Sequence, residues 1–203
     1  MRISHLVYSN TGGAGTIAIS LTNKGNKSNK YLNKIIFTGP KLSQIYKKIK
    51  KNKYSYIKTF KGFQFFSWVN VIFRLAKFKS DLVFVHNYMV IPALAYSYVF
   101  NKKIIFVDHA AYNIKGYKDI LIAKLSKFFS FNIIVLNDDN YKFYRKYDIS
   151  KNMIHLIHNG IDEKFFKRKK IKRNINKSFK IGMSARLDSF KLQELIIKAL
   201  SNK

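Results

Sequence analysis

Two histidines follow two strand-like segments at nearly the same relative position. His86 comes directly after residues 81–85 (DLVFV), and His109 comes just after residues 103–107 (KIIFV). If both segments are parallel strands, both histidines lie at the carboxyl edge of one sheet, where open α/β sheets bind ligands. A lone histidine is more often structural, but two at equivalent strand ends favour a shared crevice. Asp108 either fixes the tautomer of His109 or is a simple loop carboxylate.

A glycine-rich segment follows the first strand-like run. Gly12, Gly13 and Gly15 would let the backbone approach a ligand closely, and the helix predicted after them would offer free N–H groups to an anion. The pattern Gly13-x-Gly15-x-x-Ala also fits the dinucleotide fingerprint, which expects an acidic residue about 20 positions later. No acidic residue precedes Asp81, which argues against a nicotinamide or flavin site. A tight turn without a ligand is the alternative.

The segments that must position these residues alternate between strand-like and helix-like patterns. This alternation is typical of a doubly wound parallel α/β sheet of the Rossmann type. Several strand-like segments are apolar throughout, as expected of strands that are buried on both faces. The predicted strands are 3–8, 34–38, 54–59, 81–85, 103–107, 132–136 and 153–157, and the predicted helices are 16–23, 41–51, 65–78, 89–100, 117–129 and 139–147.

The end of the chain changes in character. Residues 163–178 are rich in Lys and Arg without apolar periodicity, which predicts a solvated basic linker. Residues 179–184 and 192–200 then predict one strand and one helix, which cannot bury their apolar faces on each other alone. We therefore expect an N-terminal domain over 1–162 and, over 179–203, the incomplete start of a second Rossmann-like domain.

Composition narrows the class of protein. The chain has 203 residues, of which 47% are hydrophobic, and this share supports a packed core rather than disorder. The absence of cysteine excludes disulfides and thiolate metal sites and fits a reducing compartment. No signal peptide is evident, and the apolar stretch 82–100 contains His86, Asn87 and Pro92, so it indicates a strand, a turn and a helix rather than a membrane span.

The charge balance is strongly basic. Lys and Arg number 39 against 10 Asp and Glu, which gives a net charge of +29, and residues 1–80 contain no acid. Such a surface attracts nucleic acid or anionic lipid headgroups. The alternative is compositional drift toward lysine without a functional consequence.

Two segments near the end of the chain carry a family resemblance. Residues 154–162 (IHLIHNGID), with Phe166 after them, resemble the "I-x-V-I-x-N-G-I-D-x-x-x-F" crossover of GT-B glycosyltransferases of the family-4 type. Arg186 and Lys191 stand in a segment similar to that family's "G-R-L-x-x-x-K", with Ala185 in place of the usual glycine. Upstream, the glycine-rich loop, the D-(I/L)-(I/V)-x-x-H pattern of residues 81–86 and the strand-end His109 also resemble the family, in the same order.

The resemblance implies two Rossmann-like domains, of which the first binds an acceptor and the second a nucleotide-sugar donor. Transfer would retain the anomeric configuration, without a cofactor or an obligatory metal. Arg186 and Lys191 would stabilise the leaving diphosphate, and His109 would donate a hydrogen bond near the transferred sugar. The residues that the resemblance assigns to substrate binding are Gly12, Gly13, Gly15, His86, Asn159 and Asp162.

One family feature has no counterpart in this chain. The donor-binding E-x7-E pattern is missing, since the acids after Asp162 are Glu163, Asp188 and Glu194. We therefore expect little or no transferase activity from these residues alone. A truncated gene, a split enzyme completed by a separate chain, and a degenerate relic are the open explanations.

The family-level expectation is a cytoplasmic enzyme that builds bacterial surface polysaccharide, lipopolysaccharide or capsule from a glycan or lipid-linked acceptor. The lysine-rich residues 41–61 would dock on the inner face of the membrane, or they are simply a solvated face. A non-catalytic Rossmann interaction domain is one alternative function. A nucleic-acid-binding protein is another, although no recognition-helix, zinc or RNP-like pattern supports it.

Overall fold

A computed structural model gives the fold. It divides the chain into two compact units, residues 1–160 and 161–203, which are considered separately. The described residues are 1–8, 12–27, 30–41, 49–50, 53–59, 65–86, 88–111, 114–160, 181–185 and 192–201.

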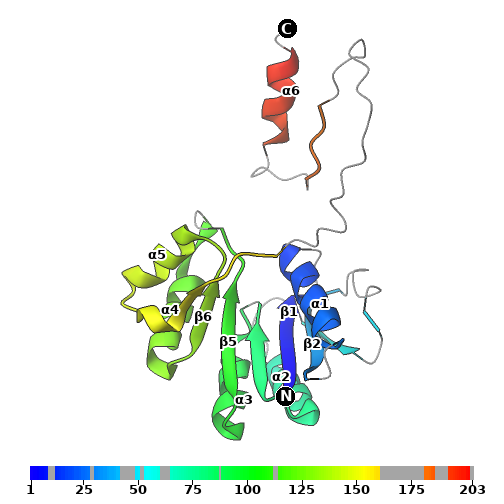
Figure 1. The fold of residues 1–203 in the computed structure, drawn as a ribbon, viewed down its shortest axis with the longest axis vertical. Coiled ribbons are helices and arrows are strands. Elements are labelled where there is room, and N and C mark those ends of the chain that lie inside the picture. The colour runs from blue at the N-terminus through cyan, green and yellow to red at the C-terminus, as the bar shows by residue number, and fades with distance from the viewer. Residues whose placement is uncertain are drawn as a thin grey trace. The chain divides into compact units, whose positions relative to one another are not determined.

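The first unit is built on a seven-stranded sheet in the order β3-β2-β1-β4-β5-β6-β7, in which every neighbouring pair is parallel. The order reverses at β1, because the chain moves outward to β2 and β3 on one side and then continues from β4 on the other (Figure 1). The strands are β1 (Arg2–Tyr8), β2 (Leu32–Gly39), β3 (Tyr54–Lys58), β4 (Leu82–Val85), β5 (Lys103–Asp108), β6 (Asn132–Val135) and β7 (Ile154–Leu156).

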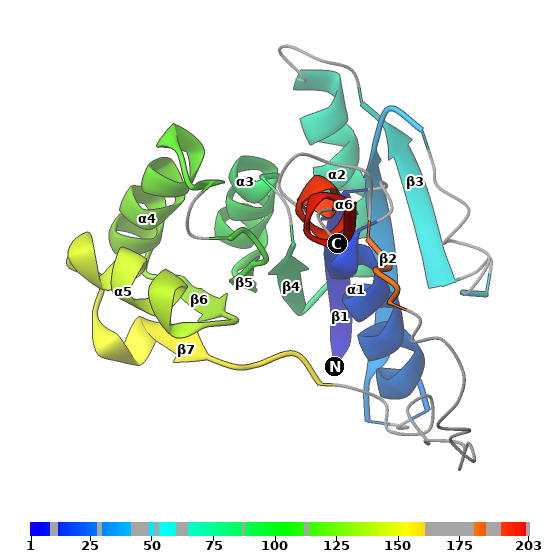
Figure 2. The same ribbon diagram turned by 90° about the horizontal axis from the view of Figure 1, so that it is seen from above.

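Helices cover both faces of this sheet. Figure 2 shows α1 on one face and α2, α3 and α4 along the other, as right-handed crossovers require when the strand order reverses. Asn101 and Ser130 adopt left-handed backbone conformations directly after α3 and α4 and end those helices. The helices are α1 (Gly13–Gly25), α2 (Phe65–Phe78), α3 (Val90–Phe100), α4 (Tyr117–Phe129) and α5 (Asp138–Lys146), with a 3-10 turn at Lys151–Met153.

Two hydrophobic clusters fill the space between the sheet and its helices. Alternation along each strand separates them: Leu6 of β1 belongs to the larger cluster under α2, α3, α4 and α5, whereas Val7 belongs to the smaller cluster under α1. Neighbouring residues of β2 divide in the same way, with Ile36 in the larger cluster and Ile35 in the smaller. Both faces of the central strands are therefore buried, as their apolar sequences predict.

The predicted fold class is confirmed, and the predicted bounds of the strands and helices differ from the observed ones by a few residues. One element differs from the prediction: a strand was expected over 179–184, but in its described part, 181–184, no regular secondary structure is present. In this second unit the described part includes one helix, α6 (Gln193–Ser201), none of whose residues is buried. A strand is held by its neighbours, and among the described residues of this unit no partner strand pairs with 181–185. The helix predicted over 41–51 and the linker at 163–178 lie mainly or wholly outside the described residues.

Candidate functional site

The candidate site lies where the strand order reverses, between β1 and β4. The chain leaves these neighbouring strands on opposite faces of the sheet, so their carboxyl ends open into a crevice that open α/β folds use for ligands. His86 directly follows β4 and lies at this junction of the two strands, because its backbone N–H donates a hydrogen bond to the carbonyl of Leu6 on β1 at 2.8 Å. His109 follows the end of β5, the next strand in the sheet.

Three histidines form a continuous chain of hydrogen bonds across this part of the sheet. His5 Nδ1 lies 3.1 Å from His86 Nε2, and His86 Nδ1 lies 2.9 Å from His109 Nε2. At the other end, His5 Nε2 lies 3.4 Å from the Asn33 side-chain oxygen. The four residues come from β2, β1 and the ends of β4 and β5, which are adjacent in the sheet. The predicted proximity of His86 and His109 is therefore confirmed.

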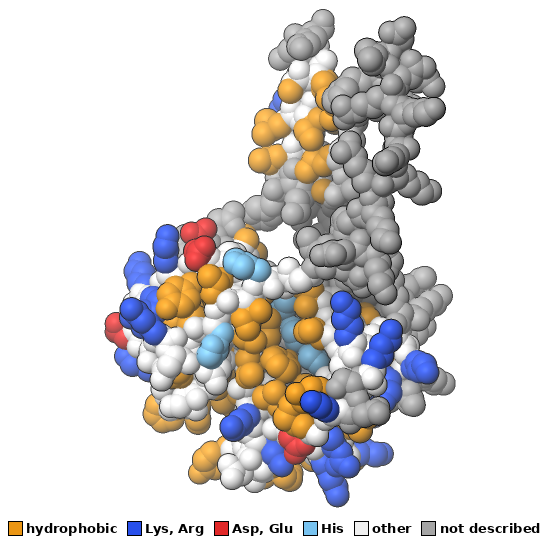
Figure 3. Space-filling model, in the orientation of Figure 1, with side chains coloured by type: hydrophobic (Ala, Val, Ile, Leu, Met, Phe, Trp, Pro, Cys, Tyr) orange, Lys and Arg blue, Asp and Glu red, His pale blue; other side chains and the backbone are white. Residues whose placement is uncertain are grey.

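The three bonded histidines have largely apolar surroundings. The His5 ring stacks on Phe84, with centroids 5.3 Å apart and planes at 10°. His5 and His86 are buried, whereas His109 is partly exposed. Figure 3 shows histidine side chains among hydrophobic ones on one face of the first unit. Such an environment penalises a charged imidazole.

Burial lowers the pKa of all three rings. The pKa of His5 falls from 6.5 to about 4, mainly through desolvation, although the hydrogen bond to Asn33 opposes this shift. Desolvation and the positive charges that His5 and His109 would carry lower the pKa of His86 well below its usual value. Desolvation also lowers the pKa of His109, and the nearby carboxylate of Asp108 partly offsets it. The three rings are therefore neutral at pH 7.

This burial predicts a loss of stability in mild acid. Between pH 6.5 and about 4 the unfolded chain protonates His5 while the folded chain does not, so the free energy of unfolding falls as the pH drops. One such group contributes a slope of up to about 1.4 kcal/mol per pH unit. Urea unfolding at several pH values in this range should show a smaller slope for His5→Gln than for wild type. His155→Gln changes an exposed histidine that is not part of the histidine hydrogen-bond chain and is the control. Equal slopes for all three proteins would contradict the prediction.

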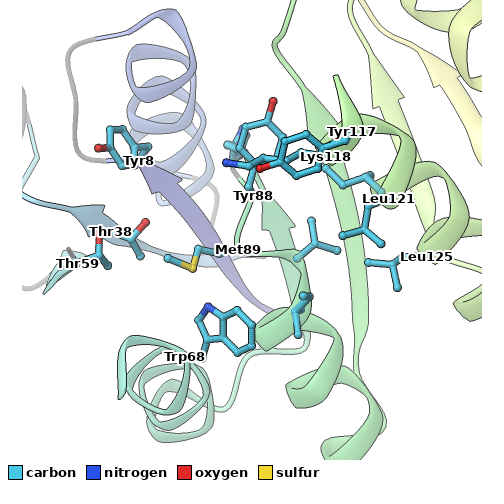
Figure 4. Close-up of a pocket in the computed structure, with 14 residues that line it drawn as sticks. Tyr8, Thr38, Thr59, Trp68, Tyr88, Met89, Tyr117, Lys118, Leu121 and Leu125 are labelled. Carbon is cyan, nitrogen blue, oxygen red and sulfur yellow. The ribbon is translucent and has the colours of Figure 1, made fainter. Parts of the chain in front are cut away.

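A cavity of about 720 Å³ opens beside His86 at the carboxyl edge, on the side of α2, α3 and α4. In Figure 4, Trp68 from α2 and Leu121 and Leu125 from α4 point into the space from different sides. Ten of the fourteen lining residues have aromatic or aliphatic side chains, and His86 also lines it. The cavity is therefore suited to an apolar group that extends toward the histidine chain.

One end of the cavity carries a positive charge. Lys118 is the charged residue among the described lining residues, and its ammonium lies 5.3 Å from the ring centroid of Tyr88 and 5.8 Å from that of Tyr117 (Figure 4). Desolvation, together with the carboxylates of Asp119 and Asp108, raises the pKa of the Tyr88 hydroxyl to about 12. Tyr88 is thus a neutral hydrogen-bonding group at pH 7, and Lys118 can attract an anion.

A buried ionic network supports the loop that carries His109. The ammonium of Lys115 contacts the carboxylate of Asp108 and lies 3.8 Å from that of Asp119. The other oxygen of Asp108 accepts a hydrogen bond from the Ala110 N–H at 3.0 Å. The expectation that Asp108 fixes the tautomer of His109 is therefore wrong, because its hydrogen bonds go elsewhere and the His109 ring bonds to His86. Asp108 is not an open loop carboxylate either, since it is buried at the end of β5.

The remaining predicted site residues are only partly brought together. Gly12 is the N-cap of α1, and Gly13 and Gly15 lie in its first turn rather than in a loop. A Cβ at Gly12 or Gly13 would meet no atom within 4 Å, so the space around them is open. Asn159 is exposed after β7. Asp162, Arg186 and Lys191 lie outside the described residues, and their roles stay predictions.

Sequence reasoning missed His5 and Asn33, which extend the histidine pair into a chain. The available signal was a polar side chain inside the apolar run of residues 3–8. It also missed Trp68, whose place at helical spacing within α2 indicated only core packing. Among the residues that the structure describes, no group of three or more His, Asp or Glu is arranged to hold a metal ion. Within the same residues, no helix is both long and apolar enough to cross a bilayer.

Comparisons with known proteins identify a family and a fold. The family model described as Glycosyltransferase Family 4 matches residues 32–165, about two thirds of the chain. HepE from Anabaena, in complex with UDP and glucose, superposes with a TM-score of 0.76 at 14% identity, covering 100% of this chain and 58% of HepE. The apo form of the lipopolysaccharide outer core galactosyltransferase WaaB gives a TM-score of 0.64 at 16% identity, covering 79% of this chain and 46% of WaaB.

The same fold also occurs in a different class of enzyme. UDP-GlcNAc 2-epimerase from Neisseria meningitidis, bound to UDP-GlcNAc, superposes with a TM-score of 0.52 at 14% identity, covering 77% of this chain and 46% of the epimerase. No curated protein matches the sequence. The chain spans about half the length of these solved structures, and at such identities the likeness shows the fold alone.

Proposed function

This chain belongs to glycosyltransferase family 4, and from that premise we propose that its first unit is the acceptor-binding half of a retaining glycosyltransferase. The acceptor occupies the cavity at the carboxyl edge, with its reacting hydroxyl near His86 and His109. The aromatic and aliphatic lining beside a histidine chain, with one lysine at the mouth, is the observation that carries this proposal. A purely polar glycan would gain little from such a surface.

The lining further points to an amphipathic, anionic acceptor. Trp68, Leu121 and Leu125 provide contacts for a hydrocarbon chain. Burial of such a chain contributes about 25 cal/mol of favourable free energy per Å² of apolar surface. Lys118, between Tyr88 and Tyr117, provides a charge for a phosphate or diphosphate. A lipid diphosphate that carries a sugar combines both groups, and this acceptor class suits the assembly of a surface polysaccharide, lipopolysaccharide or capsule.

The donor is proposed to be a nucleotide sugar. HepE has been solved with UDP-glucose and with UDP and glucose, and this supports a uridine diphosphate sugar for the family member described here. Arg186 and Lys191 remain the predicted contacts to the leaving diphosphate. The chain spans about half the length of its structural neighbours, and transfer is proposed for the whole two-domain enzyme.

Acceptor binding can be measured through a built-in reporter. Trp68 is the only tryptophan of the chain and lines the cavity, so its fluorescence should change saturably when a farnesyl diphosphate-linked monosaccharide binds. An alkyl glucoside should bind more weakly because it lacks the anion, and the free monosaccharide should produce no change at the same concentrations. Leu121→Ala should weaken binding about tenfold, since it removes roughly 1.5 kcal/mol of apolar contact.

The controls come from the same helix. Phe128 also lies on α4 and is 80% exposed, but it does not line the cavity, so Phe128→Ala should bind the probe as wild type does. Lys118→Met should weaken binding of the diphosphate probe and leave that of the alkyl glucoside unchanged. Equal weakening by Leu121→Ala and Phe128→Ala, or a response that never saturates, would count against an acceptor cavity.

The mouth of the cavity also suits contact with an anionic membrane surface. Phe66 of α2 is 83% exposed and Tyr117 of α4 is 76% exposed. Both stand in the first turn of helices that start at the carboxyl edge of the sheet. Apolar side chains beside a cavity for lipid, on a chain of net charge +29, favour docking on anionic lipid. Of residues 41–61, for which docking was expected from the sequence, the greater part lies outside the described residues.

A further inference from the structure

The histidine chain determines which nitrogen of His109 carries a proton. A hydrogen bond between two ring nitrogens needs one N–H donor and one bare acceptor, and a neutral imidazole carries a single N–H. Since burial keeps His5, His86 and His109 neutral, each ring that bonds on both sides must donate from one nitrogen and accept at the other. The direction chosen at one end of the chain therefore sets the direction at every link.

Asn33 sets that direction at the buried end. Its side-chain oxygen faces His5 Nε2 at 3.4 Å, and an amide oxygen can only accept. The backbone of Asn33 is held by Asn26, whose side-chain oxygen accepts from the Asn33 N–H at 2.7 Å and whose side-chain nitrogen donates to the Asn33 carbonyl at 3.1 Å. Gly25 leaves room for the amide, since a Cβ at Gly25 would lie 2.5 Å from the Asn33 side-chain nitrogen.

Each later link follows from this first one. His5 donates its Nε2–H to Asn33, so its Nδ1 is bare and accepts from His86 Nε2–H at 3.1 Å. His86 Nδ1 is then bare and accepts from His109 Nε2–H at 2.9 Å. The single proton of the His109 ring is used in this last bond, which leaves its Nδ1 without a proton.

We propose that Asn33, His5 and His86 are positioning residues that hold His109 in the Nε2–H tautomer, so that His109 presents a hydrogen-bond acceptor to a ligand hydroxyl. The sequence-based expectation had His109 donate a hydrogen bond, and the two roles differ in the group they recognise. An acceptor nitrogen binds the O–H of a sugar or of the incoming acceptor, whereas a donor would bind a ring oxygen or a phosphate oxygen. His109 is partly exposed, and the proposal assigns its bare Nδ1 to the ligand.

The tautomers can be read directly by NMR on the full 203-residue chain labelled with 15N-histidine, because a protonated and a bare ring nitrogen have well-separated 15N shifts. At neutral pH, His5, His86 and His109 should each show a protonated Nε2 and a bare Nδ1. His158 serves as an internal reference of the opposite kind, since its Nδ1 faces the carbonyl of Leu136 at 3.0 Å and must donate. A His109 ring protonated at Nδ1 would overturn the proposal.

Substitution of Asn33 tests whether this residue sets the donor–acceptor direction of the hydrogen bonds between the three histidines. Asn33→Leu removes the acceptor and puts no donor in its place, so His109 should change from one tautomer to a mixture of the two. Asn132→Leu is the matched control, because Asn132 accepts from His155 Nε2 at 3.1 Å in an exposed pair that is separate from the three bonded histidines. If Asn33→Leu leaves the His109 tautomer unchanged, or Asn132→Leu changes it equally, Asn33 does not set the direction.

The inference rests on the proposed function only where it names a sugar or acceptor hydroxyl as the ligand group. The tautomers are measured without any ligand, whereas the proposed function is tested by probe binding at Trp68. A failure of one experiment therefore leaves the other result intact.

Discussion

Replacing Lys115 with methionine is expected to lower the free energy of unfolding of the first unit by about 3–5 kcal/mol. The Lys115 side chain is 2% exposed and neutralises the carboxylates of Asp108 and Asp119, which are 1% and 3% exposed. Methionine fills a similar volume but leaves both carboxylates buried without a cation. Urea unfolding followed by circular dichroism would measure the loss, and the thermal midpoint should fall by roughly 2–4 °C for each kcal/mol.

A surface ion pair provides the matched control for this prediction. Lys102 lies 3.2 Å from Asp81, but both side chains are more than a third exposed, so Lys102→Met should cost less than about 1 kcal/mol. Asp108→Asn combined with Lys115→Met should cost less than the sum of the two single changes, because the pair is removed together. Equal effects at Lys102 and Lys115 would show that burial of the network does not matter.

The network also holds together the two ends of the loop that carries His109. Lys115 ties the end of β5, at Asp108, to Asp119 in the first turn of α4. The ammonium lies 4.7 Å from the ring centroid of Phe143 and 5.0 Å from that of Tyr144 on α5. Three elements therefore converge on one side chain, which explains why a single substitution should have so large an effect.

The double substitution Phe66→Ser, Val69→Ser is expected to reduce binding to anionic vesicles by at least about tenfold. Phe66 is 83% exposed and Val69 is 48% exposed on α2, and each apolar side chain removed from water contributes about 1.5–3 kcal/mol when it is fully buried. Co-sedimentation with vesicles of phosphatidylglycerol in phosphatidylcholine would measure the change. Wild type should bind pure phosphatidylcholine much more weakly, because the basic surface then has no anionic partner.

Phe128→Ser is the control for the vesicle experiment. Phe128 is as exposed as Phe66, at 80%, but it stands near the end of α4 and thus at the amino edge of the sheet, away from the cavity mouth. Its substitution should leave vesicle binding unchanged if the carboxyl edge faces the lipid. Equal losses for the two variants would indicate non-specific hydrophobic adsorption, and equal binding to neutral and anionic vesicles would contradict the electrostatic part.

Local patterns in the sequence were enough to predict most of the secondary structure of the fold. The largely apolar run of residues 132–136 predicted a strand, which is observed as β6, and helical spacing of apolar residues over 65–78 and 117–129 gave the bounds of α2 and α4 as observed. These features depend on the period of side chains along one segment, which is present in the sequence itself. The strand expected over 179–184 is absent from its described part, 181–184, because a strand also needs a neighbour to pair with, and a local pattern does not show one.

The sequence by itself determined the class of the fold, the family and the edge of the sheet at which His86 and His109 stand. Only the tertiary structure showed that β1 lies beside β4, which places His5 next to His86 although 81 positions separate them in the chain. The same holds for Lys115, whose neighbours in the sequence gave no sign of a buried charge. A chain of hydrogen bonds and a buried ion pair depend on which strands and helices become neighbours, and that choice is made by packing the whole core rather than by the pattern of any one segment.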